Sequence, residues 1–386
     1  MTAEVFSGSM QALPQLETLR GLDRELPTPA LIVHADIARA NVARFAALTD
    51  AARVKLRPHA KSHKSDLLAG WQRDAGCVGL TVGTFEEAEY FLAAGHRDLF
   101  VACPPVGPGR AEALADLARR ADVIVSVDGE VALARVDAVA AAAGRPIRYY
   151  WEMDAGFGRY GTPAGSATAD AVREAQRFEH AVFAGLMNFG GRAYGVGDPH
   201  DVAKVSRAEA EQTVETAELI RKCGIDVPEV SVGSTPSAAA AIAVEGVTEL
   251  RAGTYIFNDA TQVALGSAGM SECAQTICTT VMSAQDGRVV VDAGSKALPK
   301  ETMSRLTNGY GSVLGHPDLV IERVSEEASV LTWSPATGVD PADRPGVGDQ
   351  LQLISNHCCS ATYLFSHFWL VGAGLLDRLP IGARTR

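Results

Sequence analysis

Apolar residues form short continuous runs between residues 30 and 256, separated by stretches in which they recur every three or four positions. Continuous apolar runs are typical of parallel strands that are buried on both faces. The intervening stretches have the spacing of amphipathic helices, as at Ile37, Val42 and Phe45, and several end at a glycine. The predicted strands cover 30–34, 54–58, 77–83, 98–103, 122–127, 147–153, 183–189, 229–233 and 249–256.

This alternation predicts eight or nine strand–helix units, which favours a (β/α)8 barrel over the alternative of a doubly wound open sheet. After residue 266 the helical spacing disappears, and polar turns separate the apolar segments as in an antiparallel β domain. We therefore predict a barrel over 27–265 and a β domain over 266–386, which the weakly patterned segment 1–26 is expected to join. Strands of the β domain are expected at 276–282, 288–292, 319–324, 329–332 and 350–354.

Length and charge narrow the classes of protein that fit. A chain of 386 residues fits two domains, and a formal net charge of −11 argues against nucleic-acid binding, which needs a basic face. No apolar run is long enough to span a bilayer, and no export signal is recognisable at the N-terminus. The seven scattered cysteines indicate reduced thiols, so we expect a cytoplasmic protein.

A barrel carries its chemistry at the C-terminal ends of its strands, and the second predicted strand ends in the basic segment RPHAKSHK over 57–64. Lys61 lies there between His59 and His63. Neighbouring cations and partial burial both disfavour an ammonium group, so the pattern indicates a free amine that forms a Schiff base. We take these three residues as candidate catalytic residues. A solvated basic loop that caps the next helix is the alternative.

The sixth predicted strand leads into the segment DAGFGRYG over 154–161, which contains the pattern G-x-G-x-x-G. The pattern is typical of dinucleotide binding when it follows the first strand, whereas here it follows the sixth and no acidic residue ends the next strand. Arg159 is better interpreted as a hydrogen-bond donor to an anionic group at this end of the barrel. A surface arginine is the alternative.

Two late segments have the character of phosphate-binding loops. In the first, SVGSTPS over 231–237, Ser234 or Thr235 can cap the following helix, whose N-terminus favours an anion. A well-capped helix without a ligand is the alternative. The second loop, RAGTY over 251–255, follows the last predicted strand and contributes Gly253, Thr254 and Tyr255.

A histidine and a cysteine lie two positions apart in the β domain, at His357 and Cys359 after the strand at 350–354. If the strand continues, both side chains point to the same side. Imidazole and thiolate together suit zinc, and only two protein ligands would leave positions for water and substrate. Packing in the core is the alternative.

Taken together, these segments resemble the D-threonine aldolase and D-serine dehydratase family of alanine-racemase-like pyridoxal-phosphate enzymes. The resemblance runs from about Pro27 to Tyr363. It is carried by four motifs in the same order: TPALIV at 28–33, PHAKSHK at 58–64, STP at 234–236 and NHCC at 356–359. The combination of the proline-histidine-x-lysine element with the late histidine-x-cysteine element is specific to this family.

The resemblance implies a barrel followed by a β domain, joined as a homodimer. It implies that Lys61 carries pyridoxal 5'-phosphate as a Schiff base and that Arg159 donates to the phenolic oxygen of the cofactor. Tyr194, Thr235, Gly253 and Thr254 match positions that hold the cofactor's ring and phosphate, and Ser234 and Tyr255 adjoin them. His357 and Cys359 match the ligands of a divalent metal, for which Zn²⁺ is expected and Mn²⁺ or Mg²⁺ are alternatives.

The resemblance implies a lyase that acts on small D-3-hydroxy amino acids. Relatives often carry a tyrosine near Met187, a histidine-bearing stretch at Phe189 and a histidine at Ala328. The cysteine at 359 and the missing histidine near Phe189 favour a D-serine dehydratase, which gives a 2-oxo acid and ammonia. A D-threonine aldolase, which gives glycine and an aldehyde, is the alternative. A racemase, a non-catalytic carrier of pyridoxal phosphate and a dinucleotide-dependent oxidoreductase are further alternatives.

Overall fold

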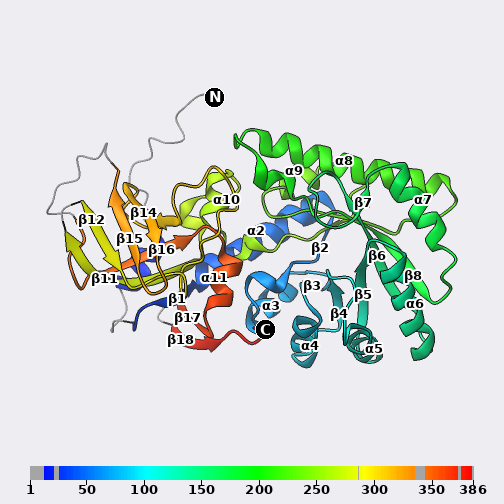
Figure 1. Ribbon diagram of the computed structural model, residues 1–386, viewed down its shortest axis with the longest axis horizontal. Coiled ribbons are helices and arrows are strands. Elements are labelled where there is room, and N and C mark those ends of the chain that lie inside the picture. The colour runs from blue at the N-terminus through cyan, green and yellow to red at the C-terminus, as the bar shows by residue number, and fades with distance from the viewer. Residues whose placement is uncertain (1–12, 21–25, 286, 335–343, 373–374, 385–386) are drawn as a thin grey trace.

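The computed structural model describes residues 13–20, 26–285, 287–334, 344–372 and 375–384. A barrel and a β domain lie next to each other along the longest axis of the molecule (Figure 1). Most of segment 1–26, which was predicted to join the β domain, lies outside the described residues. Its described helix, α1 (Pro14–Arg20), places Gln15 Nε2 3.0 Å from the backbone oxygens of both Met270 and Cys273.

Eight parallel strands form the barrel in the order β2, β10, β9, β8, β6, β5, β4, β3. The first and last of these strands are joined by backbone hydrogen bonds from Val78 N to Leu56 O (3.0 Å) and from Thr81 N to Pro58 O (2.8 Å). The predicted barrel is confirmed, and the open doubly wound sheet is wrong. The strands are β2 (Lys55–Leu56), β3 (Leu80–Val82), β4 (Asp98–Val101), β5 (Asp122–Val127), β6 (Ile147–Asp154), β8 (Ala181–Met187), β9 (Glu229–Val232) and β10 (Glu249–Leu250).

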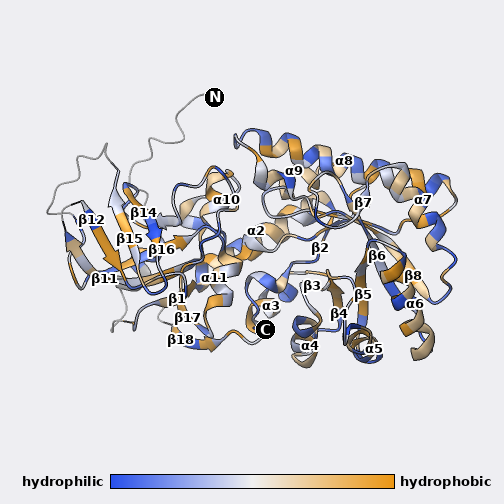
Figure 2. Ribbon diagram, in the orientation of Figure 1, coloured by the Kyte–Doolittle hydropathy of each residue, from blue (hydrophilic) through white to orange (hydrophobic). Residues whose placement is uncertain are grey.

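Amphipathic helices cover the outside of the barrel, and Figure 2 shows hydrophobic residues along the strands that they cover. Val42 and Phe45 lie on the buried face of α2, as their spacing predicts. Gly144 ends α6 in the left-handed conformation, with φ of 63°. The main helices are α2 (Ala35–Ala52), α3 (Asp66–Asp74), α4 (Phe85–Ala93), α5 (Arg110–Arg120), α6 (Glu130–Ala143), α7 (Ser166–Ala175), α8 (Asp201–Lys222), α9 (Ala238–Ala241) and α10 (Ala260–Ala264).

The first predicted strand, β1 (Ala30–His34), does not belong to the barrel. It pairs antiparallel with β11 (Gln275–Gln285) and parallel with β17 (His367–Gly372) in the sheet of the β domain. All five of its residues are buried, which is the same apolar pattern that a barrel strand shows. An apolar run indicates that a strand is buried on both faces, but it does not indicate which strands are its neighbours. The sequence pattern therefore could not assign β1 to the β domain.

The β domain is a nine-stranded sheet in which every pair except β1–β17 is antiparallel. The five strands predicted after residue 266 are confirmed as β11, β12, β14, β15 and β16, and three more were not predicted. The predicted domain boundary at residue 265 stays a prediction. The strands other than β1, β11 and β17 are β12 (Arg288–Val291), β13 (Gly311–Val313), β14 (Leu319–Val324), β15 (Ser329–Trp333), β16 (Gln350–Ser355) and β18 (Leu375–Pro380).

Candidate active site

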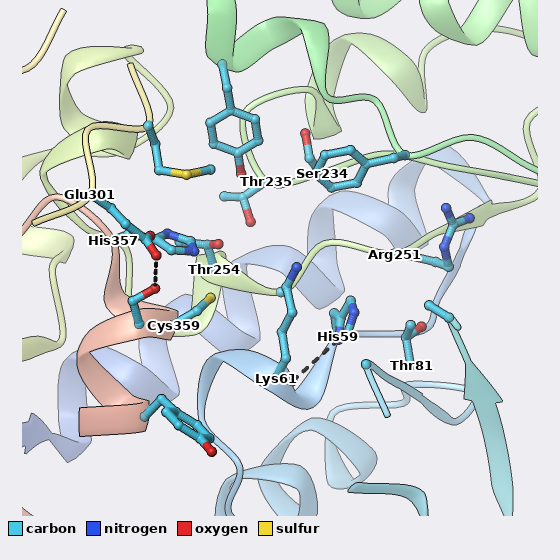
Figure 3. Close-up of a pocket in the computed structure, with 18 of the residues that line it drawn as sticks. His59, Lys61, Thr81, Ser234, Thr235, Arg251, Thr254, Glu301, His357 and Cys359 are labelled. Carbon is cyan, nitrogen blue, oxygen red and sulfur yellow. Dashed lines mark hydrogen bonds between the residues drawn. The ribbon is translucent and has the colours of Figure 1, made fainter. Parts of the chain in front are cut away.

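A cavity of about 970 Å³ lies where the C-terminal ends of the barrel strands face helix α11 (Cys358–Leu364) of the β domain (Figure 3). Ten of the twelve predicted site residues line it, although they come from segments far apart in the sequence. Their roles stay predictions, but their convergence in one cavity is a property of the fold. These ten are His59, Lys61, Arg159, Tyr194, Ser234, Thr235, Gly253, Thr254, His357 and Cys359.

Lys61 lies in the short 3-10 turn η1 (Ala60–Ser62) that follows the end of β2. Its side chain extends into the cavity (Figure 3), and Nζ lies 5.9 Å from the centroid of the Phe189 ring. His59 Nδ1 accepts the backbone N–H of Lys61 (3.4 Å). Burial, together with the positive charges of Lys61 and Arg251, holds the pKa of His59 well below its usual value. His59 is therefore a neutral imidazole beside the lysine amine.

Two predicted site residues do not line the cavity. His63 is fully buried, where Nε2 lies 3.2 Å from Gln72 Oε1 and burial lowers its pKa to about 4. Tyr255 is also fully buried; its ring stacks on Phe45 and its hydroxyl accepts from Gln72 Nε2 (3.0 Å). Both side chains contact Gln72 on α3, outside the barrel. Neither residue lines the cavity, and the roles predicted for His63 and Tyr255 stay predictions.

The two predicted phosphate loops lie side by side. The backbone N–H of Tyr255 donates to Thr235 Oγ1 (3.0 Å), and Ser234 Oγ donates to Gly190 O (2.9 Å). Gly233, with φ of +101°, lets the first loop turn at this point. The hydroxyl groups and glycines here, close to buried Arg251, fit the phosphate group of an anionic cofactor.

Arg159 extends over an aromatic ring instead of serving a dinucleotide loop. Its guanidinium carbon lies 4.3 Å from the centroid of Phe189, and Nη2 lies 3.9 Å from Glu152 Oε1. In a dinucleotide site, the backbone N–H groups of 156–158 would donate to a phosphate. Here they donate to the carboxylate of Asp154. The glycine pattern is therefore a turn closed by its own carboxylate, and Arg159 remains a donor at the cavity.

His357 and Cys359 both line the cavity, but not by the strand geometry expected from the sequence. His357 is extended, with φ of −142°, whereas Cys358 starts helix α11, so Cys359 lies in the first helical turn. A hydrogen bond with Cys358, and the nearby His357, hold the pKa of Cys359 well below its usual value. His357 Nδ1 is buried without a hydrogen-bond partner in the described part of the chain.

The donors at this wall fit a soft divalent metal ion. A thiolate and an imidazole are ligands that zinc prefers, and the carboxylate near Nδ1 would leave Nε2 of His357 as the ligand nitrogen. Asp259 Oδ2 lies 3.5 Å from His357 Nδ1, as an outer-shell carboxylate would. Among the described residues no group of three potential ligands comes together, so no third such side chain joins His357 and Cys359 in a cluster.

Sequence reasoning missed several residues that line the same cavity. Glu301 lies on the wall of His357, where its Oε1 accepts from Ser360 Oγ (2.7 Å; Figure 3). Lys64 forms a buried ion pair with Glu87, and both residues also line the cavity. Glu301 comes from an irregular segment with no periodic pattern, and Glu87 looks like an ordinary residue of an amphipathic helix. No local signal in the sequence marks either one.

Comparison with known families identifies this arrangement. Residues 33–261 match the model of the alanine racemase N-terminal domain, and residues 274–371 match that of a serine dehydratase domain. The chain belongs to the alanine-racemase-like family of pyridoxal-phosphate enzymes. The family predicted from the four motifs is thereby confirmed, and the two matched regions follow the barrel and the β domain of the structure.

Similar proteins within this family include dehydratases and aldolases. D-threo-3-hydroxyaspartate dehydratase of Delftia sp. (strain HT23) is 32% identical over 90% of this chain and 95% of its own. D-threonine aldolase of Arthrobacter sp is 30% identical over 92% of each chain. The solved structure of the Delftia enzyme has a TM-score of 0.83 and 30% identity, and covers 92% of this chain and 97% of its own.

Two further solved structures are variants of D-threo-3-hydroxyaspartate dehydratase in which a histidine or a cysteine is replaced by alanine, and the cysteine variant is in a metal-free form. Among the described residues, no helix combines the length and the apolar composition that a membrane span needs. The homodimer and the cytoplasmic location stay predictions.

Proposed function

We propose that this chain is a pyridoxal-phosphate- and metal-dependent lyase that converts small D-3-hydroxy amino acids into 2-oxo acids and ammonia, as a D-serine dehydratase does. One observation carries the proposal: the amine of Lys61 and the His357–Cys359 pair share a single cavity. Removal of a hydroxyl group from C3 needs a base near Cα and an acid near the hydroxyl oxygen. Lys61 would supply the base from one wall of the cavity, and a metal ion held by His357 and Cys359 would supply the acid from the other.

Lys61 is the residue that would hold the cofactor covalently through Nζ. Pyridoxal phosphate, when bound, supplies the electron sink that stabilises negative charge at Cα. Lys61 Nζ would also serve as the base that takes the α-proton of a bound substrate. Because His59 is neutral, it would not compete with Lys61 for the anionic groups of the cofactor.

The remaining cofactor contacts follow from the two loops and the arginine. Thr235 and Thr254 would donate hydroxyl hydrogen bonds to the phosphate, with Ser234 next to them in the first loop and Gly253 allowing close approach of the backbone. Arg159 would donate to the phenolic oxygen from its position over Phe189. Tyr194 and Phe189, whose rings stack at 6.4 Å, close this side of the cavity to water.

His357 and Cys359 would hold the divalent metal, which we propose is Zn²⁺, with Mn²⁺ or Mg²⁺ as alternatives. Such an ion supplies Lewis acidity toward a hydroxyl oxygen at this wall. Among the described residues no third potential ligand clusters with His357 and Cys359, which would leave coordination positions for that oxygen. This open donor set is typical of a catalytic and not a structural metal site.

A D-threonine aldolase is the second candidate, because an aldolase of this kind is 30% identical to the chain. Cleavage of the Cα–Cβ bond requires a base that removes the proton of the 3-hydroxyl group. The ring of Phe189 lies beside Lys61 and provides no such base. This favours dehydration.

Product analysis separates the two activities. Purified protein loaded with pyridoxal phosphate and Zn²⁺ is incubated with D-serine and D-threonine, and the L-isomers serve as controls. We expect 2-oxo acids and ammonia from the D-isomers alone. Glycine and acetaldehyde from D-threonine would establish the aldolase instead, and turnover of neither D-isomer would contradict the proposed function.

A further inference from the structure

A buried carboxyl group lies behind the loop that closes the active site. Glu209 on α8 is 1% exposed, and its Oε1 accepts the backbone N–H of Arg192 (3.2 Å). Arg192 opens the 3-10 turn η2 (Arg192–Gly195), in the loop that brings Phe189 and Tyr194 to the cavity. Arg192 Nη1 also donates to Ala155 O (3.3 Å). One hydrogen bond thus connects Glu209 to this loop, and Arg192 connects it to the loop after β6.

The two loops meet at Phe189. Its ring centroid lies 5.3 Å from that of Phe157 and 6.4 Å from that of Tyr194, and the guanidinium carbon of Arg159 lies 4.3 Å away. Lys61 Nζ lies 5.9 Å from the same centroid. Packed side chains transmit a backbone displacement because there is little space to absorb it. A change in the position of the loop backbone would therefore alter the environment of the lysine and the arginine together.

Few groups around Glu209 stabilise a negative charge on its carboxyl group. Its Oε2 is buried without a hydrogen-bond partner in the described part of the chain, and so is the hydroxyl of Ser206 one turn earlier. The charged groups that face it among the described residues are Arg192, which favours ionisation, and Asp154, which opposes it. Burial is the largest influence and raises the pKa of Glu209 to about 7. The carboxyl group therefore changes charge close to neutral pH.

We infer that Glu209 is a proton-linked positioning residue, which fixes the active-site loop through the backbone of Arg192 and does so more firmly as a carboxylate than as a carboxylic acid. A hydrogen bond to an ionised acceptor is roughly twice as strong as one to a neutral acceptor. The inference rests on the cavity being the active site proposed above. It does not depend on whether dehydration or aldol cleavage takes place there.

The variant Glu209→Gln tests this inference, because glutamine keeps an acceptor for the Arg192 N–H but cannot ionise. We measure kcat/KM with D-serine or D-threonine, whichever is turned over, between pH 5.5 and 8.5. The ratio of wild type to variant is expected to rise through about pH 7, by about threefold to tenfold. Glu211→Gln, on the exposed face of the same helix, should follow wild type throughout. A ratio that does not change with pH would overturn the inference.

A second measurement needs no turnover. The usual pKa of 4.5 is raised in the folded protein, so the folded state binds the proton more tightly than the unfolded state. The free energy of unfolding of the cofactor-free wild type, relative to Glu209→Gln, should therefore fall as pH rises from about 4.5 to about 7 and stay level above it. A difference that is constant across this range would contradict the buried ionisation itself. If neither D-amino acid is turned over, the proposed function fails while this result still stands.

Discussion

Ser62 connects Lys61 to helix α11, which carries Cys359. Its hydroxyl lies 3.3 Å from Cys359 Sγ, and its backbone oxygen accepts from Thr362 Oγ1 (2.8 Å) on α11. Ser62 directly follows Lys61 in a turn of only three residues. These contacts hold the backbone beside Lys61 against helix α11, so both walls of the cavity are joined at this point.

Replacing Lys61 by alanine should abolish the absorbance band of the protein-bound cofactor, because no other amine occupies its position. The absorption spectrum of the variant, after incubation with pyridoxal phosphate and gel filtration, checks this. Lys300→Ala removes an amine from another part of the same cavity and should leave the band intact. A band that persists in Lys61→Ala would refute the role assigned to this lysine.

Replacing His357 by alanine should remove the metal and lower turnover by at least about a hundredfold, while the cofactor stays bound. Metal content by elemental analysis and cofactor absorbance are measured on the same sample. His316→Ala, at a half-buried histidine remote from the cavity, should retain both. Wild-type metal content in His357→Ala would show that the metal, if any, is bound elsewhere.

At the scale of secondary-structure elements, a bulge in β8 shapes the barrel. The pairing of β6 with β8 shifts register between Tyr149 and Tyr150, and Gly185 on the opposite strand has φ of +143°. A Cβ atom at Gly185 would lie only 2.1 Å from the backbone oxygen of Glu229 on β9. Glycine is required here because two backbones approach closely at a positive φ.

The substitution Gly185→Ala should therefore destabilise the protein by about 3 kcal/mol or more, since steric overlap with backbone adds to the strain of a positive φ. Chemical denaturation followed by circular dichroism gives the free energy of unfolding. Gly197→Ala is the matched control, because nothing lies within 4 Å of its Cβ position, and it should stay within about 1 kcal/mol of wild type. Equal stability of the two variants would contradict the close approach.

For the molecule as a whole, a buried ion pair holds the barrel together across strands that are distant in sequence. Arg57 Nε donates to Glu249 Oε2 (2.7 Å) and Nη1 to Asp98 Oδ1 (2.5 Å). Ser231 Oγ donates to Glu249 Oε1 (2.6 Å), and the hydroxyl of Tyr150 lies 3.4 Å from Oε2. The carboxylate of Glu249 on β10 therefore contacts side chains from β9, from β6 and from the segment that follows β2.

Replacing Glu249 by alanine should cost about 3 kcal/mol of unfolding free energy, because Arg57 then keeps only one of its two partners in a buried site. Denaturant unfolding measures the loss. Lys55→Ala removes a largely exposed cation from its pair with Glu229 at the same edge of the barrel, and should cost less than about 1 kcal/mol. A loss no greater for Glu249→Ala would mean that the buried network adds nothing to barrel closure.

The sequence alone determined the features that depend on neighbouring residues. Continuous apolar runs identified the buried strands of the barrel, because burial on both faces is recorded locally in each run. The basic segment around Lys61 and the pair His357 and Cys359 were found because each motif is contiguous. The rule that a barrel carries its chemistry at one end predicted the position of Lys61, whereas only the fold brings His357 and Cys359 of the β domain to the same cavity.

Only the tertiary structure decided features that depend on contacts between distant segments. β1 has the composition of a barrel strand, yet it lies in the other sheet, because its hydrogen-bonding partners come from residues more than 200 positions away. The start of a helix at Cys358 changed the geometry expected of Cys359. Glu209 and Glu301 are ordinary acidic residues in the sequence. Glu209 becomes buried, and Glu301 reaches the cavity, only when the chain folds. Both properties depend on residues that are distant in the sequence.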